Sequence, residues 1–121
     1  MDHAIEMVKD KKHVRIALSG RLTRNDLENA RDDASSALMA GHCDRLLVDA
    51  TRVTYELSDL EFFQFTSEHR SRLPKGTRIA LLISPDELSN FRFVENVAQN
   101  RAVNLLLFVD TDKAVNWLVD N

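Results

Sequence analysis

Two segments with apolar side chains, residues 4–8 and 13–19, lie within the first twenty residues of the chain. In residues 13–19 every second side chain is large and apolar, and this period of two is typical of a strand with one buried face. Residues 4–8 precede that segment across the short charged stretch 9–12. The pattern therefore predicts a β-hairpin, and Gly20 is expected to end its second strand.

The spacing of apolar residues changes to that of a helix after Gly20. Thr23 and Asp26 have the separation of an N-cap residue and its capping-box partner. The helical face that follows consists of Leu27, Ala30, Ala34, Ala37 and Leu38. Because three of these five residues are alanine, we expect this helix to lie close to a sheet. Gly41 is expected to end it.

Three short apolar runs, at residues 45–50, 78–83 and 103–109, predict buried strands of a central sheet. A helical pattern follows each run, so the order of elements is β-β-α-β-α-β-α-β-α. A hairpin followed by alternating strands and helices indicates an α/β fold with a mixed, mostly parallel sheet and helices packed against it. With 121 residues, the chain is expected to form one domain over residues 1–121.

Polar residues mark the starts of the last three helices. Ser58 begins a pattern that extends to about residue 72, where a proline and a glycine follow. Ser84, followed directly by proline, is expected to cap a helix that runs toward residue 99, either as one helix or as two shorter pieces. Asp110 or Thr111 is expected to cap the last helix.

Composition and charge exclude several classes of function. A net charge of -3 and a pI near 5.8 do not supply the basic face that nucleic-acid-binding proteins need. The apolar runs are far shorter than the ~20 residues of a membrane span. The first residues also lack the pattern of a secretory signal. We therefore expect a cytoplasmic protein that binds no nucleic acid and does not insert into membranes.

Residue types that hold metals and cofactors are sparse in this chain. Cys43 is the single cysteine, so we expect neither an internal disulfide nor a thiolate metal site. The four histidines lack the spacing of metal ligands and are expected on the surface. The three dispersed glycines form no nucleotide-binding motif. The sequence therefore predicts no metal and no cofactor.

The strand–loop–helix segment at residues 46–61 carries the most informative polar residue, Ser58. Ser58 and Glu61 have the spacing of a capping box, and Leu57 and Phe62 flank it as a hydrophobic staple. A helix cap is therefore a sufficient structural reason for Ser58. The alternative is a phosphoacceptor, since the N-terminus of a helix favours a phosphate electrostatically.

Three short motifs lie at residues 20–26 (GRLTRND), 46–49 (LLVD) and 114–118 (AVNWL). They resemble the SpoIIAA-like branch of the STAS domains, the fold of the bacterial anti-sigma-factor antagonists. The resemblance implies that fold and a regulatory role in which a partner kinase binds the domain and phosphorylates a serine. Through the likeness of this branch to Sec14-type lipid carriers, it also implies an apolar ligand.

The chain departs from that family where the phosphorylated serine would stand. Antagonists have a D-S-S-G-L-G-type segment, whereas residues 57–62 read LSDLEF. One serine is retained, but both glycines, which permit close backbone approach by a partner, are absent. Asp59 and Glu61 already supply negative charge, which repels an added phosphate. We therefore expect a constitutive binding surface here rather than a switch.

We expect a non-catalytic binding or regulatory module that acts through the loop and helix start at residues 51–65. Its partner- or ligand-binding residues are predicted to be Thr54, Tyr55, Ser58, Asp59, Phe62 and Phe65. The polar members would provide recognition and the two phenylalanines apolar contact. The predicted partner is another protein, whose identity the sequence does not give.

A small carrier is the alternative function. Its lipid or other apolar ligand would lie between the helix at residues 58–72, the helix that contains Phe91 and Phe93, and the sheet. A homodimer is also left open, because the surplus aromatic side chains on these helices need a surface on which to pack.

Catalysis is not expected. Ser58, His69 and Asp49 contain the functional groups of a triad, but no G-x-S-x-G elbow accompanies them. Asp49 is expected at the C-terminal edge of the sheet, which is where open α/β sheets bind ligands. The carboxylate of Asp49 could equally accept backbone N–H groups in the following turn.

Overall fold

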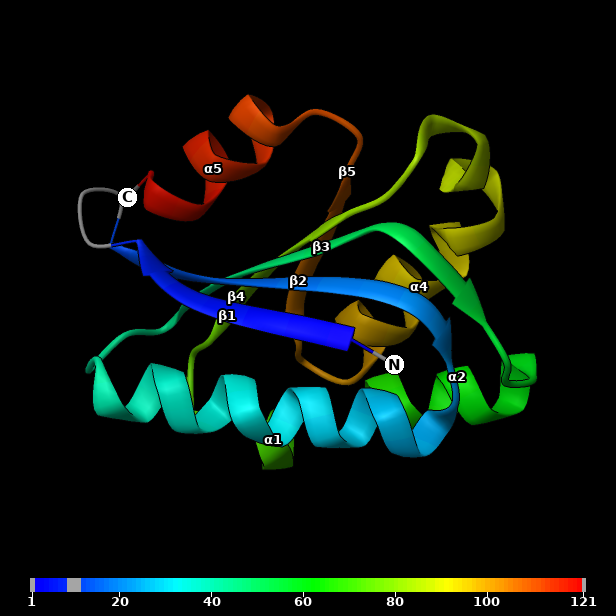
Figure 1. Cartoon of the computed structure of the whole chain (residues 1–121), viewed down its shortest axis with the longest axis horizontal. Coiled ribbons are helices and arrows are strands. Elements are labelled where there is room, and N and C mark those ends of the chain that lie inside the picture. The colour runs from blue at the N-terminus through cyan, green and yellow to red at the C-terminus, as the bar shows by residue number, and fades with distance from the viewer. Residues whose placement is uncertain (1, 9–11, 121) are drawn as a thin grey trace.

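The computed structural model describes residues 2–8 and 12–120 and forms a five-stranded sheet with helices on both faces (Figure 1). The strands follow one another in the order β1-β2-β3-β4-β5; β1 is antiparallel to β2, and the other pairs are parallel. The predicted α/β class and element order are thereby confirmed. Part of the predicted hairpin loop, residues 9–11, lies outside the described residues. The elements are β1 (Asp2–Val8), β2 (His13–Leu22), α1 (Arg24–Ala40), β3 (Arg45–Tyr55), α2 (Asp59–Ser67), α3 (His69–Arg72), β4 (Arg78–Leu82), the 3-10 helix η1 (Pro85–Glu87), α4 (Leu88–Asn100), β5 (Asn104–Phe108) and α5 (Thr111–Val119).

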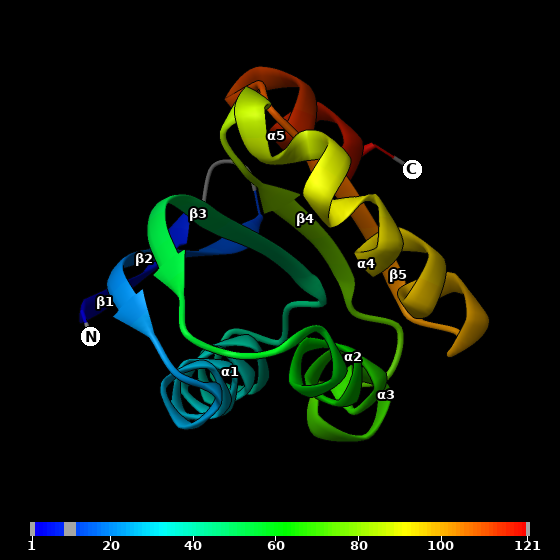
Figure 2. The same ribbon diagram turned by 90° about the vertical axis from the view of Figure 1, so that its right-hand side faces the viewer.

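The two faces of the sheet carry different helices. Helices α1, α2 and α4 cover one face, and α5 covers the other (Figure 2). Because successive parallel strands are added in one direction and their connections are right-handed, the three connecting helices fall on the same side. The larger hydrophobic cluster lies under these three helices, and the smaller one lies under α5 around Leu47, Ala80 and Leu118.

Strands β2 and β3 are longer than the sequence predicted. Gly20 does not end β2; it has a φ of +90° inside the strand, and the pairing register shifts between Ala17 and Ser19. The last residues of β2 pair with Arg52 to Tyr55 of β3. The expectation of a loop from residue 51 is therefore wrong, because this pairing holds the segment in a strand as far as Tyr55.

The helix ends are mostly those predicted. Thr23 and Ser58 each form a complete capping box, and Asp110 caps α5 by accepting from the N–H of Lys113. Ser84 is an exception: its hydroxyl donates to the carbonyl of Thr51 at 3.2 Å, so it ties η1 to β3 and caps no helix. The helix predicted for residues 58–72 is also divided into α2 and α3 at Glu68.

Two histidines contradict the predicted surface location. His13 is 2% exposed at the start of β2, a central strand paired on both sides. His69 is 9% exposed at the start of α3, where its ring packs edge-on against Phe65. His3 and His42 remain accessible, and Cys43 is half-buried.

Candidate functional site

A groove opens at the edge of the sheet where the parallel strands β3 and β4 end. We call it the edge groove; its volume is about 360 Å³, and it lies between the end of β3, the start of α2, and the segment from η1 into α4. Four of the six predicted site residues line it, namely Thr54, Tyr55, Asp59 and Phe62. The carboxyl ends of parallel strands are the usual place for ligands in open α/β sheets.

Aromatic rings form the floor of the edge groove. Phe62 meets Tyr55 at 5.1 Å, Phe91 at 5.4 Å and Phe93 at 6.1 Å between ring centroids, in edge-to-face arrangements. Burial, reinforced by the negative charge of Glu87, raises the pKa of the Tyr55 phenol. The Tyr55 hydroxyl therefore stays protonated and can donate a hydrogen bond.

The rim of the edge groove is acidic. Asp59, Asp86 and Glu87 stand around it, and none of them forms an ion pair with another described residue. Sequence reasoning missed Asp86 and Glu87 as site residues. Their position after Ser84-Pro85 marked a helix start, but only the folded chain places that start opposite Asp59.

Ser58 and Phe65, the other two predicted residues, do not line the edge groove. Ser58 is exposed; its hydroxyl accepts from the N–H of Glu61 at 3.1 Å, and the Glu61 carboxylate accepts from the N–H of Ser58 at 3.0 Å. Ser58 is thus a helix cap, as predicted. Phe65 points inward beneath Phe62, with 6.4 Å between the ring centroids.

The side chains of a serine–histidine–aspartate triad are not brought together. Ser58 caps α2, and Asp49 accepts from Arg15 at 2.7 Å and from Thr51. The carboxylate of Asp49 thus accepts the N–H of Thr51, as considered, but both residues lie within β3 and not in a turn. His69 is buried beside Arg31, so each of the three groups is engaged elsewhere.

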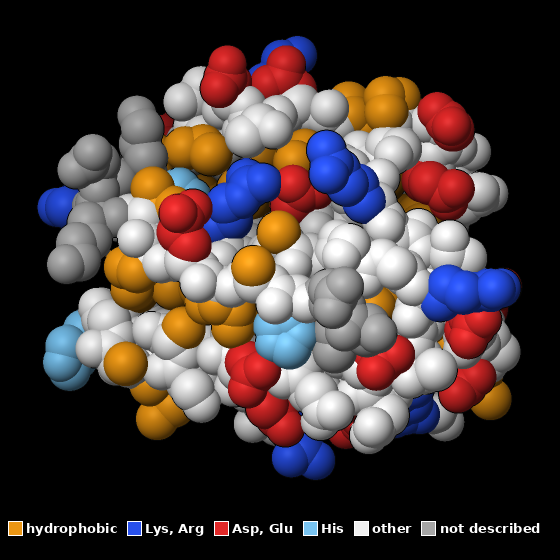
Figure 3. Space-filling view, viewed as in Figure 1, with side chains coloured by type: hydrophobic (Ala, Val, Ile, Leu, Met, Phe, Trp, Pro, Cys, Tyr) orange, Lys and Arg blue, Asp and Glu red, His pale blue; other side chains and the backbone are white. Residues whose placement is uncertain are grey.

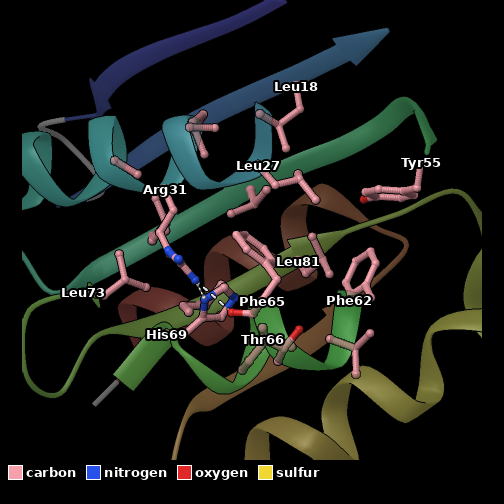
Figure 4. A pocket seen from close by; sticks show the side chains of 18 residues that line it. Leu18, Leu27, Arg31, Tyr55, Phe62, Phe65, Thr66, His69, Leu73 and Leu81 are labelled. Atoms are coloured by element: carbon pink, nitrogen blue, oxygen red, sulfur yellow. Dashed lines mark hydrogen bonds between the residues drawn. The ribbon is translucent and has the colours of Figure 1, made fainter. Parts of the chain in front are cut away.

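A second space, which we call the internal cavity, lies between the sheet and helices α1, α2 and α3 (Figure 4). Its volume is about 70 Å³, and its lining is apolar apart from a few groups that include Arg31 and His69. Phe65 lines this cavity, whereas Tyr55 and Phe62 line both it and the edge groove. Neither Phe91 nor Phe93 is part of its lining, unlike the predicted carrier site.

The polar end of the internal cavity is formed by Arg31 and His69. One terminal nitrogen of Arg31 donates to the carbonyl of Phe65 at 2.8 Å and lies 3.3 Å from Nδ1 of His69. A guanidinium only donates, so Nδ1 accepts and the histidine proton is on Nε2. Burial, followed by the charge of Arg31, lowers the pKa of His69 to about 3. The imidazole is therefore neutral near pH 7.

The sequence contains a signal for both residues. Arg31 follows Leu27 by four positions and precedes Ala34 by three, so it lies on the buried face of α1. His69 follows Phe65 by four positions in the same way. A charged residue on an apolar helical face is unusual enough to mark a site.

The fold is that of the SpoIIAA-like domains, as the sequence motifs predicted. An anti-sigma factor antagonist from Mycobacterium paratuberculosis superimposes with a TM-score of 0.65 at 14% identity, covering 98% of this chain and 96% of that one. Unphosphorylated SpoIIAA gives 0.62 at 20% identity, covering 99% and 100%. A Shewanella loihica protein of the DUF3478 family, described as having a SpoIIAA-like fold, gives 0.61 at 22% identity, covering 97% and 92%.

These similarities concern the fold alone. No protein-family model and no curated protein matches the sequence. Among the described residues, no helix has the length and apolar character needed to cross a bilayer, and no cluster of three or more potential ligand side chains is placed to hold a metal ion. On the face seen in Figure 3, acidic and basic side chains are interspersed.

Proposed function

We propose that this protein is a non-catalytic, cytoplasmic regulatory module that binds another protein through the edge groove. The observation that carries the proposal is the groove itself, with an aromatic floor and an acidic rim at the end of the parallel strands. Its fold, shared with proteins described as anti-sigma factor antagonists, suggests an anti-sigma factor as the class of partner.

The predicted residues take separate roles in this proposal. Thr54 and Asp59 are exposed at the rim and would contact polar groups of the partner. Tyr55 and Phe62 would provide the apolar surface of the floor, as buried aromatic side chains do at many interfaces. Ser58 fixes the start of α2 and thereby the position of Asp59. Phosphorylation of Ser58 stays a prediction, which the absence of the family's glycines disfavours.

Calorimetric titration with the anti-sigma factors of the source organism tests the proposal. Reversing the charge at the rim with Asp59→Lys is expected to weaken binding about tenfold or more, because it places a positive charge against the basic groups that an acidic rim attracts, and like charges across an interface are costly. Asp112→Lys, the same substitution at an exposed position on α5, is the matched control and should leave affinity within about twofold. Equal losses in both variants would argue against the edge groove as the binding surface.

A second copy of this chain is another protein that could occupy the edge groove. Sedimentation analysis of the isolated protein tests that homodimer. A dimer that Asp59→Lys dissociates and Asp112→Lys does not would assign the groove to self-association.

A small-molecule carrier is the second candidate function, and the internal cavity favours it. The cavity of about 70 Å³ lies between the sheet and helices α1, α2 and α3, and close-packed protein interiors leave few voids larger than a water molecule. Native mass spectrometry of protein purified from cells tests this function. A co-purifying small molecule supports a carrier, and its absence together with a bound second protein supports the interaction module.

A further inference from the structure

Arg31 is a charged side chain buried in the interior of this protein. It is 6% exposed, and its guanidinium carbon lies 4.5 Å from the centroid of the Phe65 ring. Its Nε is buried without any acceptor. Figure 4 shows Arg31 reaching from α1 toward His69 of α3 at one end of the internal cavity.

Among the described residues no carboxylate lies within ion-pair distance of Arg31, although the charges of Glu68 and Glu28 interact favourably with it from farther away. None of the ion pairs among the described residues includes Arg31, and the groups that it contacts are a carbonyl, a neutral imidazole and an aromatic ring. A buried charge is costly unless it is paired with an opposite one. The site therefore combines an unused donor with a charge that no direct ion pair neutralises, and an anion in contact with the guanidinium would satisfy both.

The remainder of the internal cavity limits what that anion can be. Away from Arg31 the walls are aliphatic and aromatic side chains such as Ile16, Leu46 and Leu81. A water needs roughly 10–15 Å³ of such space, so about 70 Å³ holds an occupant of roughly five to seven non-hydrogen atoms. A charged head with a short apolar tail fits these walls, whereas an inorganic anion would leave them without contacts.

We propose that the internal cavity binds a small aliphatic monocarboxylate. Its carboxylate accepts hydrogen bonds from Nε and a terminal nitrogen of Arg31, in the paired geometry that guanidinium and carboxylate favour. Its alkyl chain packs against the apolar walls. This inference rests on the carrier function and names its class of ligand.

The surface beside the cavity suits the approach of an anion. A depression of about 480 Å³ next to α3 shares His69, Leu73 and Ile79 with the internal cavity, so the two spaces are neighbours. Arg70 and Lys75 lie in its lining. Positive charge at such an entrance raises the local concentration of anions.

Titration of the purified protein with butyrate and butyramide, followed by backbone amide NMR shifts, tests the proposal. The two molecules have the same size and differ in charge. We expect butyrate to bind about tenfold more tightly or better, since hydrogen bonds between charged groups are roughly twice as strong as neutral ones. The largest shifts should fall on residues around Arg31 and His69. Arg31→Gln should abolish the preference, and Arg78→Gln, which alters the other arginine whose Nε is buried without a partner, should retain it.

Each of the other outcomes overturns the inference. Equal binding of butyrate and butyramide would be consistent with a carrier but would rule out a carboxylate as its class of ligand. If neither molecule binds, both the carrier function and the carboxylate ligand are ruled out, whereas the proposed protein binding at the edge groove is not affected. If Arg31→Gln does not fold, a crystal grown with 3-bromopropionate decides, because its bromine gives an anomalous peak. A peak inside the cavity with the carboxylate on Arg31 supports the inference, and water alone in the cavity refutes it.

Discussion

Helices α2 and α5 are built alike but lie on opposite faces of the sheet. Each has nine residues and begins at a side-chain cap, Ser58 or Asp110. Each also receives an arginine near its C-terminal end. Arg31 donates to the carbonyl of Phe65 in α2, and Arg78 donates to the carbonyls of Trp117 and Asp120 at the end of α5.

The likeness of the two arginines extends to their aromatic contacts and their unused donors. The guanidinium of Arg31 lies over the ring of Phe65, and that of Arg78 over the ring of Trp117. In both, Nε is buried without a partner. Arg78, however, is only half-buried and borders neither the edge groove nor the internal cavity. The hydrogen bonds to the end of α5 are a sufficient structural reason for Arg78. The hydrogen bond of Arg31 to α2 does not explain why a charged group lies beside the internal cavity.

The largest effect of a single substitution is expected at the aromatic side chain under each arginine. Phe65→Ala should lower the free energy of unfolding by about 3 kcal/mol, because Phe65 is buried and the space it leaves adds to the internal cavity. Trp117→Ala should cost about 1–2 kcal/mol, since Trp117 is only half-buried. Urea denaturation measures both. Equal losses of stability in the two variants would mean that Phe65 and Trp117 contribute equally to the packing of their helices.

The pH dependence of stability should distinguish the surroundings of Arg31, which include His69, from those of Arg78. The pKa of His69 is about 3 in the folded protein, against about 6.5 in an unfolded chain. Between these values the unfolded state binds more protons, so stability falls as the pH is lowered from about 6.5, by up to ~1.4 kcal/mol per pH unit.

His69→Gln should remove this part of the pH dependence, as unfolding curves at pH 7, 6, 5 and 4 would reveal. Substituting an exposed histidine, as in His42→Asn, is the control and should preserve the slope. Parallel curves for the wild type and His69→Gln would contradict the assignment of a neutral buried imidazole.

Replacing each arginine by methionine tests whether their charges have different costs. Arg31→Met should leave stability unchanged or raise it by about 1 kcal/mol, because an unpaired buried charge is removed and the Phe65 carbonyl keeps the N–H of Glu68 as a donor. Arg78→Met should lower stability by about 1 kcal/mol, since two carbonyls lose their donor. A similar loss in both variants would make Arg31 a structural residue only.

The smallest difference between the two helices is expected at their starts. Ser58→Ala and Asp110→Ala should each cost about 1 kcal/mol, and Ser58→Asp should be nearly neutral because aspartate also caps. Full stability of Ser58→Ala would contradict the role of the cap. Intact-mass measurement of protein from cells checks Ser58 as a phosphoacceptor: a species heavier by one phosphate that Ser58→Ala eliminates would establish it.

Local chemistry explains which parts of this structure could be predicted from the sequence. The capping boxes at Thr23 and Ser58 involve residues three positions apart, and the strands are short apolar runs, so both are visible without tertiary contacts. The continuation of β3 to Tyr55 depends on pairing with residues 19–22 of β2, which are 33 positions away. Such pairing leaves no local pattern.

The candidate sites show the same division. Four of the six predicted residues line the edge groove because the end of β3 and the start of α2 are close in sequence. The acidic residues of η1 join them only after β4 has formed beside β3. Arg31 and His69 are separated by 38 residues. Helical periodicity places each of them on a buried face, but their contact depends on the packing of α1 against α2 and α3, which the pattern of each segment alone does not report.

Tyr55 and Phe62 form a wall that the edge groove and the internal cavity share. This shared wall can couple binding in the two spaces. If an occupant of either space is sensitive to how these two rings are placed, its binding free energy includes the work of placing them. Binding in one space would then strengthen or weaken binding in the other. By linkage, each occupant would change the affinity of the other by the same factor. Two side chains would thus be sufficient for reciprocal allosteric coupling between a small molecule and a protein.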